Sequence, residues 1–596
     1  MDKKNTVIGV ILIIAAMVSF YFSAKLAPPP PRPAIETAPL SNPLAQNQAP
    51  AQGPASSPYD ATLTASPKAA GTPAEFVTLK NDFVAVRFTT AGGAIDHIEL
   101  RKHAAVLGEE ERYKLNALQA APALSFIDFP GADKDAHYQL VAQTGSEIVY
   151  RATVGNQLEI TRRYTLASAT GGDPYQIRHE TTFRNLSAES VTLPRGHVNV
   201  GTAAPINADD MGLYLNVGYY NGEDFEHVER SKLEGGGFLS GFGIGSKTDL
   251  PFIESPAAVH WASVKNQFFA SILTPDEPGS GVRIERVKIY PNAPVEDRRA
   301  YGVTGIAHFD FKPVPANATS TWGATYYAGP KEYRRLANTD HFKHNEDLAM
   351  QFGFFGFFSK LLLTIMTWVH GWMGDISPIW GWGWAIVITT LFLKIVFVPF
   401  TIAASRSSKR MAKLAPMMTE LREKYKDQPQ KAQEAMMRLY KEYKVNPLGG
   451  CIPILITIPF FIGFFSMLQS ASELRYAAFL WAPDLSAPDT VARIFGFPLN
   501  IMPILMGATM IIQMRLTPTP TTDNAQAMMF KIMPWIFTIF CYNFSCALAL
   551  YSTVNGVFTI GQQMVINRMP DVELEKRPVK PAAAAGLKNV TPKKKK

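Results

Sequence analysis

The chain has 596 residues, of which 47% are hydrophobic and only 18% are charged. Its mean hydropathy is close to zero, so a large polar part must balance a strongly apolar part, which excludes an ordinary soluble globular protein. The net charge of +8 would suit a nucleic-acid binder, but Lys and Arg cluster beside apolar runs, as they do in membrane proteins. The three cysteines lie in or beside apolar runs and offer neither a disulfide framework nor a paired CxxC metal motif.

The N-terminal segment, residues 1–24, contains a short apolar run that follows two lysines. A cleaved signal peptide is the alternative, but Lys25 or Phe22 would occupy the −3 position of the cleavage site. We therefore predict an uncleaved transmembrane anchor with its N-terminus in the cytoplasm. Residues 25–74 are rich in Pro and Ala and predict an extended tether, which would lie outside the cytoplasm after the anchor.

Residues 75–345 show a different pattern, with short runs that alternate between apolar and polar residues. Val84, Val86 and Phe88 would share one face of a strand, and paired glycines separate such runs. This period of two predicts an all-β sandwich. The domain follows an anchor that starts inside, so we expect it outside the cytoplasm.

The segment 351–373 is apolar but carries one polar stripe at helical spacing, so a spanning helix and an interfacial helix both fit it. If it spanned the membrane, the basic loop 402–446 would face outward, against the positive-inside tendency. We therefore predict an interfacial amphipathic helix on the outer surface.

The remaining apolar runs predict a bundle that, with the anchor, has six transmembrane spans and both termini in the cytoplasm. The basic segment 568–596 would be a cytoplasmic tail, where it would meet anionic lipid or simply be solvated. The five later spans are expected at residues 381–401, 451–469, 498–516, 525–544 and 546–567.

Lys394 is the most informative residue, because it lies in the middle of an apolar span. A central charge costs about 2.5–3.5 kcal/mol on insertion scales and usually faces a wet interior. Thr390, Thr401 and Ser405 fall on the same helical face, so we predict a hydrophilic substrate groove there. The alternative is a lysine that snorkels to the interface, which is strained because the ends of the span, residues 381 and 401, lie 13 and 7 residues away.

The last span offers a matching polar stripe, and polar residues also interrupt the other spans. Interhelical hydrogen bonding is the alternative explanation for such residues. The spans 381–401, 451–469, 498–516 and 525–567 contain no Asp or Glu, whereas a proton-coupled transporter commonly carries one. The candidate polar residues are Gln513 in an earlier span and Ser552, Asn555, Thr559 and Gln562 or Gln563 in the last.

The loop 402–446 has the pattern of a cytoplasmic helical hairpin that turns at Pro429. Its methionines suit promiscuous recognition of apolar segments, but they would equally well pack the two helices together. We predict a recruitment surface formed by four basic and four methionine residues: Arg406, Lys409, Arg410, Lys413, Met417, Met418, Met436 and Met437.

Motifs of catalysis are missing from the sequence. There is no HExxH and no G-x-S-x-G, and GFGIGSKT at 241–248 lacks the spacing of a P-loop. We predict that the protein is not an enzyme and needs no cofactor or metal.

Several stretches resemble YidC membrane protein insertases. They are YKEYKVNPLGGCIPILITIPFFIGFFSML (440–468), PILMGATM (503–510) with the following TPTPTT, KIMPWIFTIF (531–540), TIGQQMVINR (559–568) and, in the β-rich part, TTAGGAIDHIEL (89–100). The resemblance covers essentially the whole chain.

The resemblance implies a five-helix core around a hydrophilic groove, closed toward the outside, and a periplasmic domain of the supersandwich type. Lys394 stands where the family usually has Arg, so a positive charge is kept but bidentate binding is lost. Thr390 matches a substrate contact, and Ser552, with Tyr551 beside it, falls where some members have a contacting Tyr.

We therefore predict an insertase and chaperone of the bacterial inner membrane that acts on nascent membrane proteins. Expected partners are the secretion translocon, membrane lipids, and ribosomes or signal-recognition targeting factors, but not DNA. The alternatives are a polytopic transporter or channel, which would commonly show an internal repeat, and a periplasmic assembly scaffold. Deletion of most of residues 75–320 would separate the scaffold from the insertase.

Overall fold

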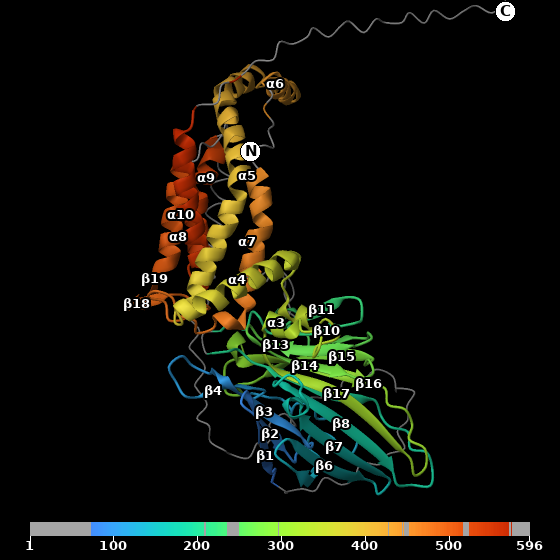
Figure 1. The fold of residues 1–596 in the computed structure, drawn as a ribbon. Helices are drawn as coiled ribbons and strands as arrows, with labels where there is room; N and C mark the ends of the chain where they lie inside the picture. The colour runs from blue at the N-terminus through green and yellow to red at the C-terminus, as the bar shows by residue number, and fades with distance from the viewer. Residues whose placement is uncertain are drawn as a thin grey trace, which may run out of the picture. The chain divides into compact units, whose positions relative to one another are not determined.

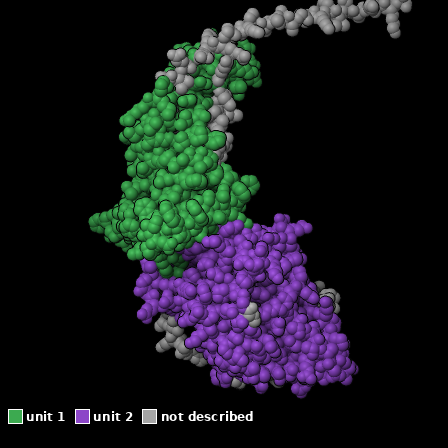
Figure 2. Space-filling model, viewed as in Figure 1, with its two compact units in different colours: residues 1–21, 353–468, 474–596 green, residues 22–352, 469–473 purple. Residues whose placement is uncertain are grey.

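The computed structural model describes residues 73–207, 210–234, 249–295, 297–426, 428–443, 445, 452–516, 524–570 and 574. The predicted anchor 1–24, almost all of the tether 25–74, the GFGIGSKT segment and most of the tail 568–596 lie outside these residues. The described chain divides into two compact units (Figures 1 and 2). One is helical and lies within residues 353–468 and 474–574; the other is β-rich and lies within residues 73–352 together with 469–473.

Three antiparallel sheets form the β-rich unit. The largest has the order β11(Phe225–Glu229), β10(Asn216–Tyr220), β13(Trp261–Lys265), β14(Phe269–Pro275), β17(Thr319–Pro330), β8(Gln176–Asn185), β7(Leu158–Leu166), β6(Glu147–Val154), β5(Gln139–Gln143). A second sheet has the order β1(Phe76–Lys80), β2(Val84–Thr89), β3(Ala94–Ala104), β4(Arg112–Leu115). The third has the order β12(Phe252–Ser255), β15(Gly281–Lys288), β16(Tyr301–Phe309), β9(Gly196–Ala203). Short helical turns connect them: η2(Ala167–Thr170), α2(Arg230–Leu233), η4(Arg298–Ala300), α3(Tyr333–Leu336) and η5(Glu346–Met350).

The third sheet packs its face against the large sheet. A Cβ on Gly305 of β16 would lie 2.8 Å from a methyl group of Val264 on β13 and 2.9 Å from one of Val217 on β10. Every residue of β16 is buried, so this strand is covered on both faces. Burial of alternate apolar side chains supplies the main favourable free energy of such a core. The observed unit confirms the predicted β-rich domain.

The two glycines of the TTAGGAIDHIEL stretch form the turn between β2 and β3. Gly92 and Gly93 have φ angles of +67° and +53°, which side chains rarely adopt. Their carbonyl oxygens accept hydrogen bonds of 2.7 Å from the buried Arg162 guanidinium and of 2.7 Å from the Tyr164 hydroxyl, respectively. A Cβ on Gly93 would lie 2.7 Å from the ring of Tyr138. This turn therefore fixes the second sheet against the large one.

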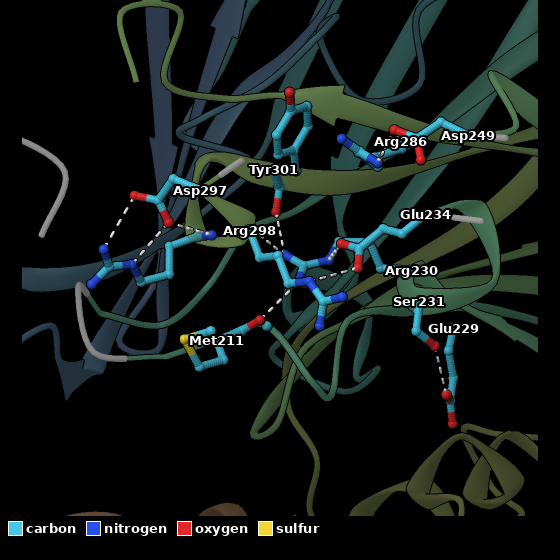
Figure 3. Close-up of polar contacts among 12 residues, drawn as sticks. Met211, Glu229, Arg230, Ser231, Glu234, Asp249, Arg286, Asp297, Arg298 and Tyr301 are labelled. Carbon is cyan, nitrogen blue, oxygen red and sulfur yellow. Dashed lines mark hydrogen bonds and ion pairs between the residues drawn. The ribbon is translucent and has the colours of Figure 1, made fainter. Parts of the chain in front are cut away.

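A buried arginine organises the loops beside β11 (Figure 3). Arg230 is 3% exposed, and its guanidinium donates to the carbonyl oxygens of Met211 at 2.7 Å, Arg298 at 2.7 Å and Tyr301 at 2.8 Å. Its Nε lies 3.1 Å from Glu234, whose other oxygen lies 3.4 Å from the exposed Arg298. Burial lowers the pKa of Arg230, and the charge of Glu234 opposes this shift. One side chain thus holds three separate chain segments together.

Residues 469–473 complete the β-rich unit although they are far along the chain from the rest of it. The side chain of Gln469 accepts a hydrogen bond of 2.8 Å from the Tyr214 hydroxyl, and its backbone carbonyl accepts one of 3.0 Å from Gln267. The Ser472 hydroxyl donates to the carbonyl of Lys331 at 3.1 Å. The unit is therefore discontinuous in sequence.

Helices make up most of the other unit: α4(Gly356–Ile376), α5(Gly381–Lys424), α6(Pro429–Glu442), α7(Ile452–Ser470), α8(Ile501–Leu516), α9(Asn524–Phe540) and α10(Cys546–Arg568). A single turn, η7(Ser472–Leu474), follows α7, and a hairpin of β18(Thr490–Ile494) and β19(Phe497–Asn500) precedes α8. Residues 498–500, which the predicted span 498–516 includes, pair with β18 instead of starting the helix.

Among the described residues, α5 is the one helix that is long and apolar enough to cross a membrane by length and composition. Its Gly381–Lys424 range joins the predicted span 381–401 and the first half of the hairpin 402–446 in one continuous helix. Three shorter apolar helical segments are Ile458–Ser470, Ile501–Leu516 and Lys531–Phe540. The helical unit confirms the predicted helical C-terminal region, while the number of spans stays a prediction.

Candidate functional site

Helices α5 and α10 lie side by side and run parallel, joined by a row of polar contacts that we call the polar seam. Lys394 Nζ donates to Thr559 Oγ1 at 2.9 Å. One or two turns further along, Gln562 Nε2 donates to Thr401 Oγ1. At the end of α10, Lys409 Nζ donates to the carbonyl oxygen of Ile566 at 2.8 Å. The seam therefore contains two of the predicted groove residues of α5, Lys394 and Thr401.

Hydrogen bonds to backbone carbonyls of their own helices orient the two threonines of the seam. The Thr559 hydroxyl donates its proton to the carbonyl of Asn555 at 2.7 Å, four residues earlier in the helix. The Thr401 hydroxyl likewise donates within its own helix, to the carbonyls of Phe397 and Val398. With the protons committed in this way, the oxygen lone pairs face the neighbouring helix and accept from a donor there.

The charge of Lys394 has a hydroxyl as its partner rather than a carboxylate. Throughout the part of the chain that the structure describes, Lys394 makes no ion pair, and Thr559 is its one acceptor. An ammonium group has three donors, so one contact to a neutral hydroxyl leaves most of its hydrogen-bonding capacity unused. The seam is thus a positive site that can still receive acceptor groups.

Two other predicted groove residues lie inside the packing of the bundle. Thr390 is 1% exposed, and its hydroxyl donates to the carbonyl of Ile386 at 2.7 Å. Tyr551 is buried and stacks on Phe464 of α7 with ring centroids 4.3 Å apart. Helical spacing predicted Thr390 and the family resemblance suggested Tyr551, but both side chains are buried in the bundle.

The remaining predicted groove residues lie partly exposed on their helices. They are Ser405 on α5, Gln513 on α8, and Ser552 and Asn555 on α10. Ser552 is notable because its Oγ is buried without a hydrogen-bond partner.

Two further hydroxyls, which our sequence analysis did not single out, share this condition. Thr389 on α5 and Thr553 on α10 have buried oxygens without a hydrogen-bond partner. Leaving such a group unpaired costs about 1–3 kcal/mol. The sequence offered one signal for them: Thr389 and Thr553 are hydroxyl residues directly beside the predicted positions Thr390 and Ser552. Both residues belong to the helices that carry the polar seam.

The hairpin of α5 and α6 divides its methionines between two roles. Met418 is buried in a small core with Met411 and Leu414, and Met436 of α6 packs against this core. The Tyr440 hydroxyl contacts the sulfur of Met418 at 3.4 Å. Met417 and Met437 are exposed instead. The packing explanation therefore applies to Met418 and Met436, while recognition of apolar segments by the exposed Met417 and Met437 stays a prediction.

The predicted basic residues of the hairpin also differ in their surroundings. Arg406 and Arg410 are exposed, whereas Lys409 and Lys413 are partly buried. Lys409 belongs to the polar seam, where it meets a carbonyl at the end of α10, a position at which a cation is favourable.

Helix α8 packs closely against α10, one of the two helices that form the polar seam. A Cβ on Gly556 of α10 would lie 2.5 Å from Thr509 Oγ1 of α8. We expect Gly556→Val to destabilise the helical unit by about 1–3 kcal/mol, because the added side chain must push the helices apart. Thermal unfolding of the purified protein in detergent measures this. Gly561→Val in the same helix is the matched control, since nothing lies within 4 Å of a Cβ there. Equal midpoints for the two variants would contradict the prediction.

Comparison with known proteins identifies the family. Residues 76–365 match the model of the YidC periplasmic domain, and residues 372–573 match that of the 60Kd inner membrane protein. The membrane protein insertase YidC of Cupriavidus necator is 30% identical over 96% of this chain and 98% of its own length. The chain belongs to the YidC membrane protein insertase family. The Cupriavidus metallidurans insertase agrees, with 31% identity over 85% of this chain and 86% of its own.

A solved structure described as an active YidC insertase with its first transmembrane domain resolved is 17% identical, with a TM-score of 0.32, covering 84% of this chain and 96% of its own. Membership of the YidC family makes this chain an insertase of the inner membrane rather than an enzyme, with a periplasmic β-rich domain. The transporter alternative is thereby replaced. The roles of the individual seam residues stay a prediction.

Proposed function

We propose that the polar seam is where this insertase receives the hydrophilic part of a nascent membrane protein. The observation that carries the proposal is the Lys394–Thr559 contact, in which a cation in the middle of an apolar helix has a neutral partner. A structural ion pair would satisfy such a charge with a carboxylate. Here an acidic segment of the substrate would supply the missing negative charge, and two unit charges 4 Å apart attract by about 4 kcal/mol at an effective dielectric constant of 20.

The proposed path is a hydrophilic groove that opens to the cytoplasm and to lipid but is closed outward. The unpartnered hydroxyls of Ser552 and Thr553, two partly exposed residues of α10, support it, because polar groups of a passing segment would satisfy them. The groove lowers the cost of moving a short polar tail across, and the apolar segment then enters lipid. Burial of apolar surface drives this step, together with the membrane potential, worth about 2.3 kcal/mol per charge per 100 mV.

Local thinning of the bilayer would shorten the polar tail's path. Helix α9 ends at Phe540, and a turn separates it from α10, which begins at Cys546. Such short segments are accommodated by a thinner bilayer at a modest cost.

The proposed topology has six spans, both termini in the cytoplasm and a periplasmic supersandwich domain, with α4 lying on the outer surface. The basic residues in the C-terminal half of α5, from Arg406 to Lys413, support a cytoplasmic position for that half. Exposed Phe357, Trp368 and Trp372 on α4 support the surface position, since aromatic side chains favour the membrane interface.

The α5–α6 hairpin is the proposed meeting point for ribosomes, targeting factors or the secretion translocon. Arg406 and Arg410 supply exposed positive charge, and Met417 and Met437 supply exposed, flexible apolar surface. No nucleotide cofactor and no DNA enter this scheme.

Site-specific photo-cross-linking tests the proposed path. A photoreactive residue at Ser552, beside the seam, should capture an arrested nascent chain whose acidic tail has just left the ribosome. The matched control is Val557 on the same helix, which is 58% exposed and should capture lipid or the apolar segment at a later chain length. Capture of the acidic tail at Val557 and not at Ser552 would overturn the groove. Capture at neither position, with the nascent chain still inserted, would place the path elsewhere.

A further inference from the structure

The hairpin between α7 and α8 exposes apolar side chains at an end of the helical unit. Its strands β18 and β19 are joined by Phe495 and Gly496. Phe495, at the tip, is 98% exposed, and Val491, Ile494 and Phe497 are exposed as well. The sequence 490–500 contains no acidic residue, and Arg493 is its one charge. Apolar groups concentrated on so short an element are unfavourable in water.

The base of the hairpin is held firmly, so the exposed tip is not a loosely attached loop. The Asn500 side chain donates to the carbonyl of Tyr542 at 2.7 Å, and the Tyr542 hydroxyl donates to the carbonyl of Pro498 at 2.8 Å. Asp489 accepts hydrogen bonds from the indole of Trp481 at 2.9 Å and from the backbone of Met502 at 2.7 Å. These contacts connect the hairpin to the start of α8 and to the turn between α9 and α10.

The hairpin is continuous with the helices of the membrane bundle. Helix α8 begins at Ile501, immediately after the last residue of β19. A strand of four residues spans about 13 Å, so the tip stays close to the first residue of α8. Leu480 and Trp481, in the segment before the hairpin, are exposed too. Within the helical unit, Figure 1 places β18 and β19 at the end opposite α6.

We propose that the β18–β19 hairpin is a wedge that inserts Phe495 and its apolar neighbours into the boundary between headgroups and acyl chains, in the leaflet opposite the α5–α6 hairpin. Aromatic side chains favour this layer, and Arg493 is placed to meet a lipid phosphate. The absence of acidic residues from 490–500 fits an anionic headgroup surface. The wedge fixes the depth of α8 and of the α9–α10 turn in the bilayer. It does not depend on the proposed role of Lys394.

Photo-cross-linking to lipid tests the wedge. The full-length protein with Phe495→p-benzoylphenylalanine is reconstituted in phosphatidylethanolamine–phosphatidylglycerol vesicles, irradiated, and analysed for lipid adducts by mass spectrometry. Val557 on α10 is the lipid-facing positive control, and exposed Gln433 on α6 is the control outside the membrane. We expect an adduct yield at position 495 similar to that at 557 and at least about fivefold above that at 433.

A yield at position 495 no higher than at 433 would overturn the proposal. The same substitution in native membranes separates lipid from protein as the occupant: lipid adducts support the wedge, and a dominant adduct with another protein replaces it by a docking site. Because Phe495 is almost fully exposed, its replacement leaves the packing of the bundle intact. A second variant, Phe495→Asp with Phe497→Asp, should increase access of a water-soluble probe to a label at Ile494, and unchanged access would also count against insertion.

Discussion

Lys394→Ala should reduce insertion of a membrane protein with a short acidic tail about tenfold, which corresponds to about 1.4 kcal/mol of lost attraction. The reason is that the seam would lose the charge of Lys394 while its threonines remain. Lys394→Arg should keep most of the activity, because Arg preserves the positive charge. Lys394→Glu should be the least active variant. The measurement is insertion into vesicles depleted of the native insertase, with each variant added back.

Controls separate charge recognition from folding. All variants must accumulate to equal levels, and Lys531→Ala, which removes an exposed lysine of α9, should insert the substrate like the wild type. A substrate whose acidic tail residues are replaced by Asn and Gln should respond little to Lys394→Ala. If Lys394→Ala inserts the acidic substrate as well as the wild type does, Lys394 is not the receptor. Insertion would then depend on groove hydration and membrane thinning instead of on the charge of Lys394.

The second large effect concerns the periplasmic domain. Arg230→Ala should lower its free energy of unfolding by about 3–5 kcal/mol, the usual cost of removing one partner of a buried ion pair. The substitution leaves Glu234 without its buried partner and deprives three backbone carbonyls of their donor (Figure 3). The change is measured by unfolding the purified full-length protein in urea, with limited proteolysis within the domain as the probe of unfolding.

Arg298→Ala is the matched control for this prediction. Its guanidinium lies 3.4 Å from the same carboxylate, but the side chain is exposed. The hydrogen bond from Arg230 is accepted by the backbone carbonyl of Arg298, which the substitution leaves in place. An exposed ion pair contributes about 0–1 kcal/mol. If both alanine variants lose the same stability, the buried guanidinium does not organise these loops.

The broad architecture followed from patterns that act locally. Alternation with a period of two requires one buried and one exposed strand face, so the β-rich domain could be predicted from Val84, Val86 and Phe88 and their counterparts. Long apolar runs likewise predicted the helical region. The strand order could not be predicted, because β9 pairs with β16 and β8 with β17 across more than a hundred residues, and no local signal specifies such partners.

For the candidate site too, local patterns could be predicted from the sequence, whereas the packing of distant segments could not. Helical spacing placed Lys394 and Thr401 on one face of α5, and both belong to the seam. The same spacing selected Thr390, which another helix covers, since spacing defines a face but not what packs against it. The pairing of Lys394 with Thr559 depends on the register between α5 and α10, which tertiary packing alone determines.

The discontinuity of the β-rich unit has a consequence for the order of biogenesis. Translation delivers residues 73–352 first, yet Gln469 and Ser472, which bond to Tyr214, Gln267 and Lys331, emerge only after residues 353–468 have been made. The β-rich unit therefore cannot form its last contacts until α7, at whose end these residues lie, has been synthesised.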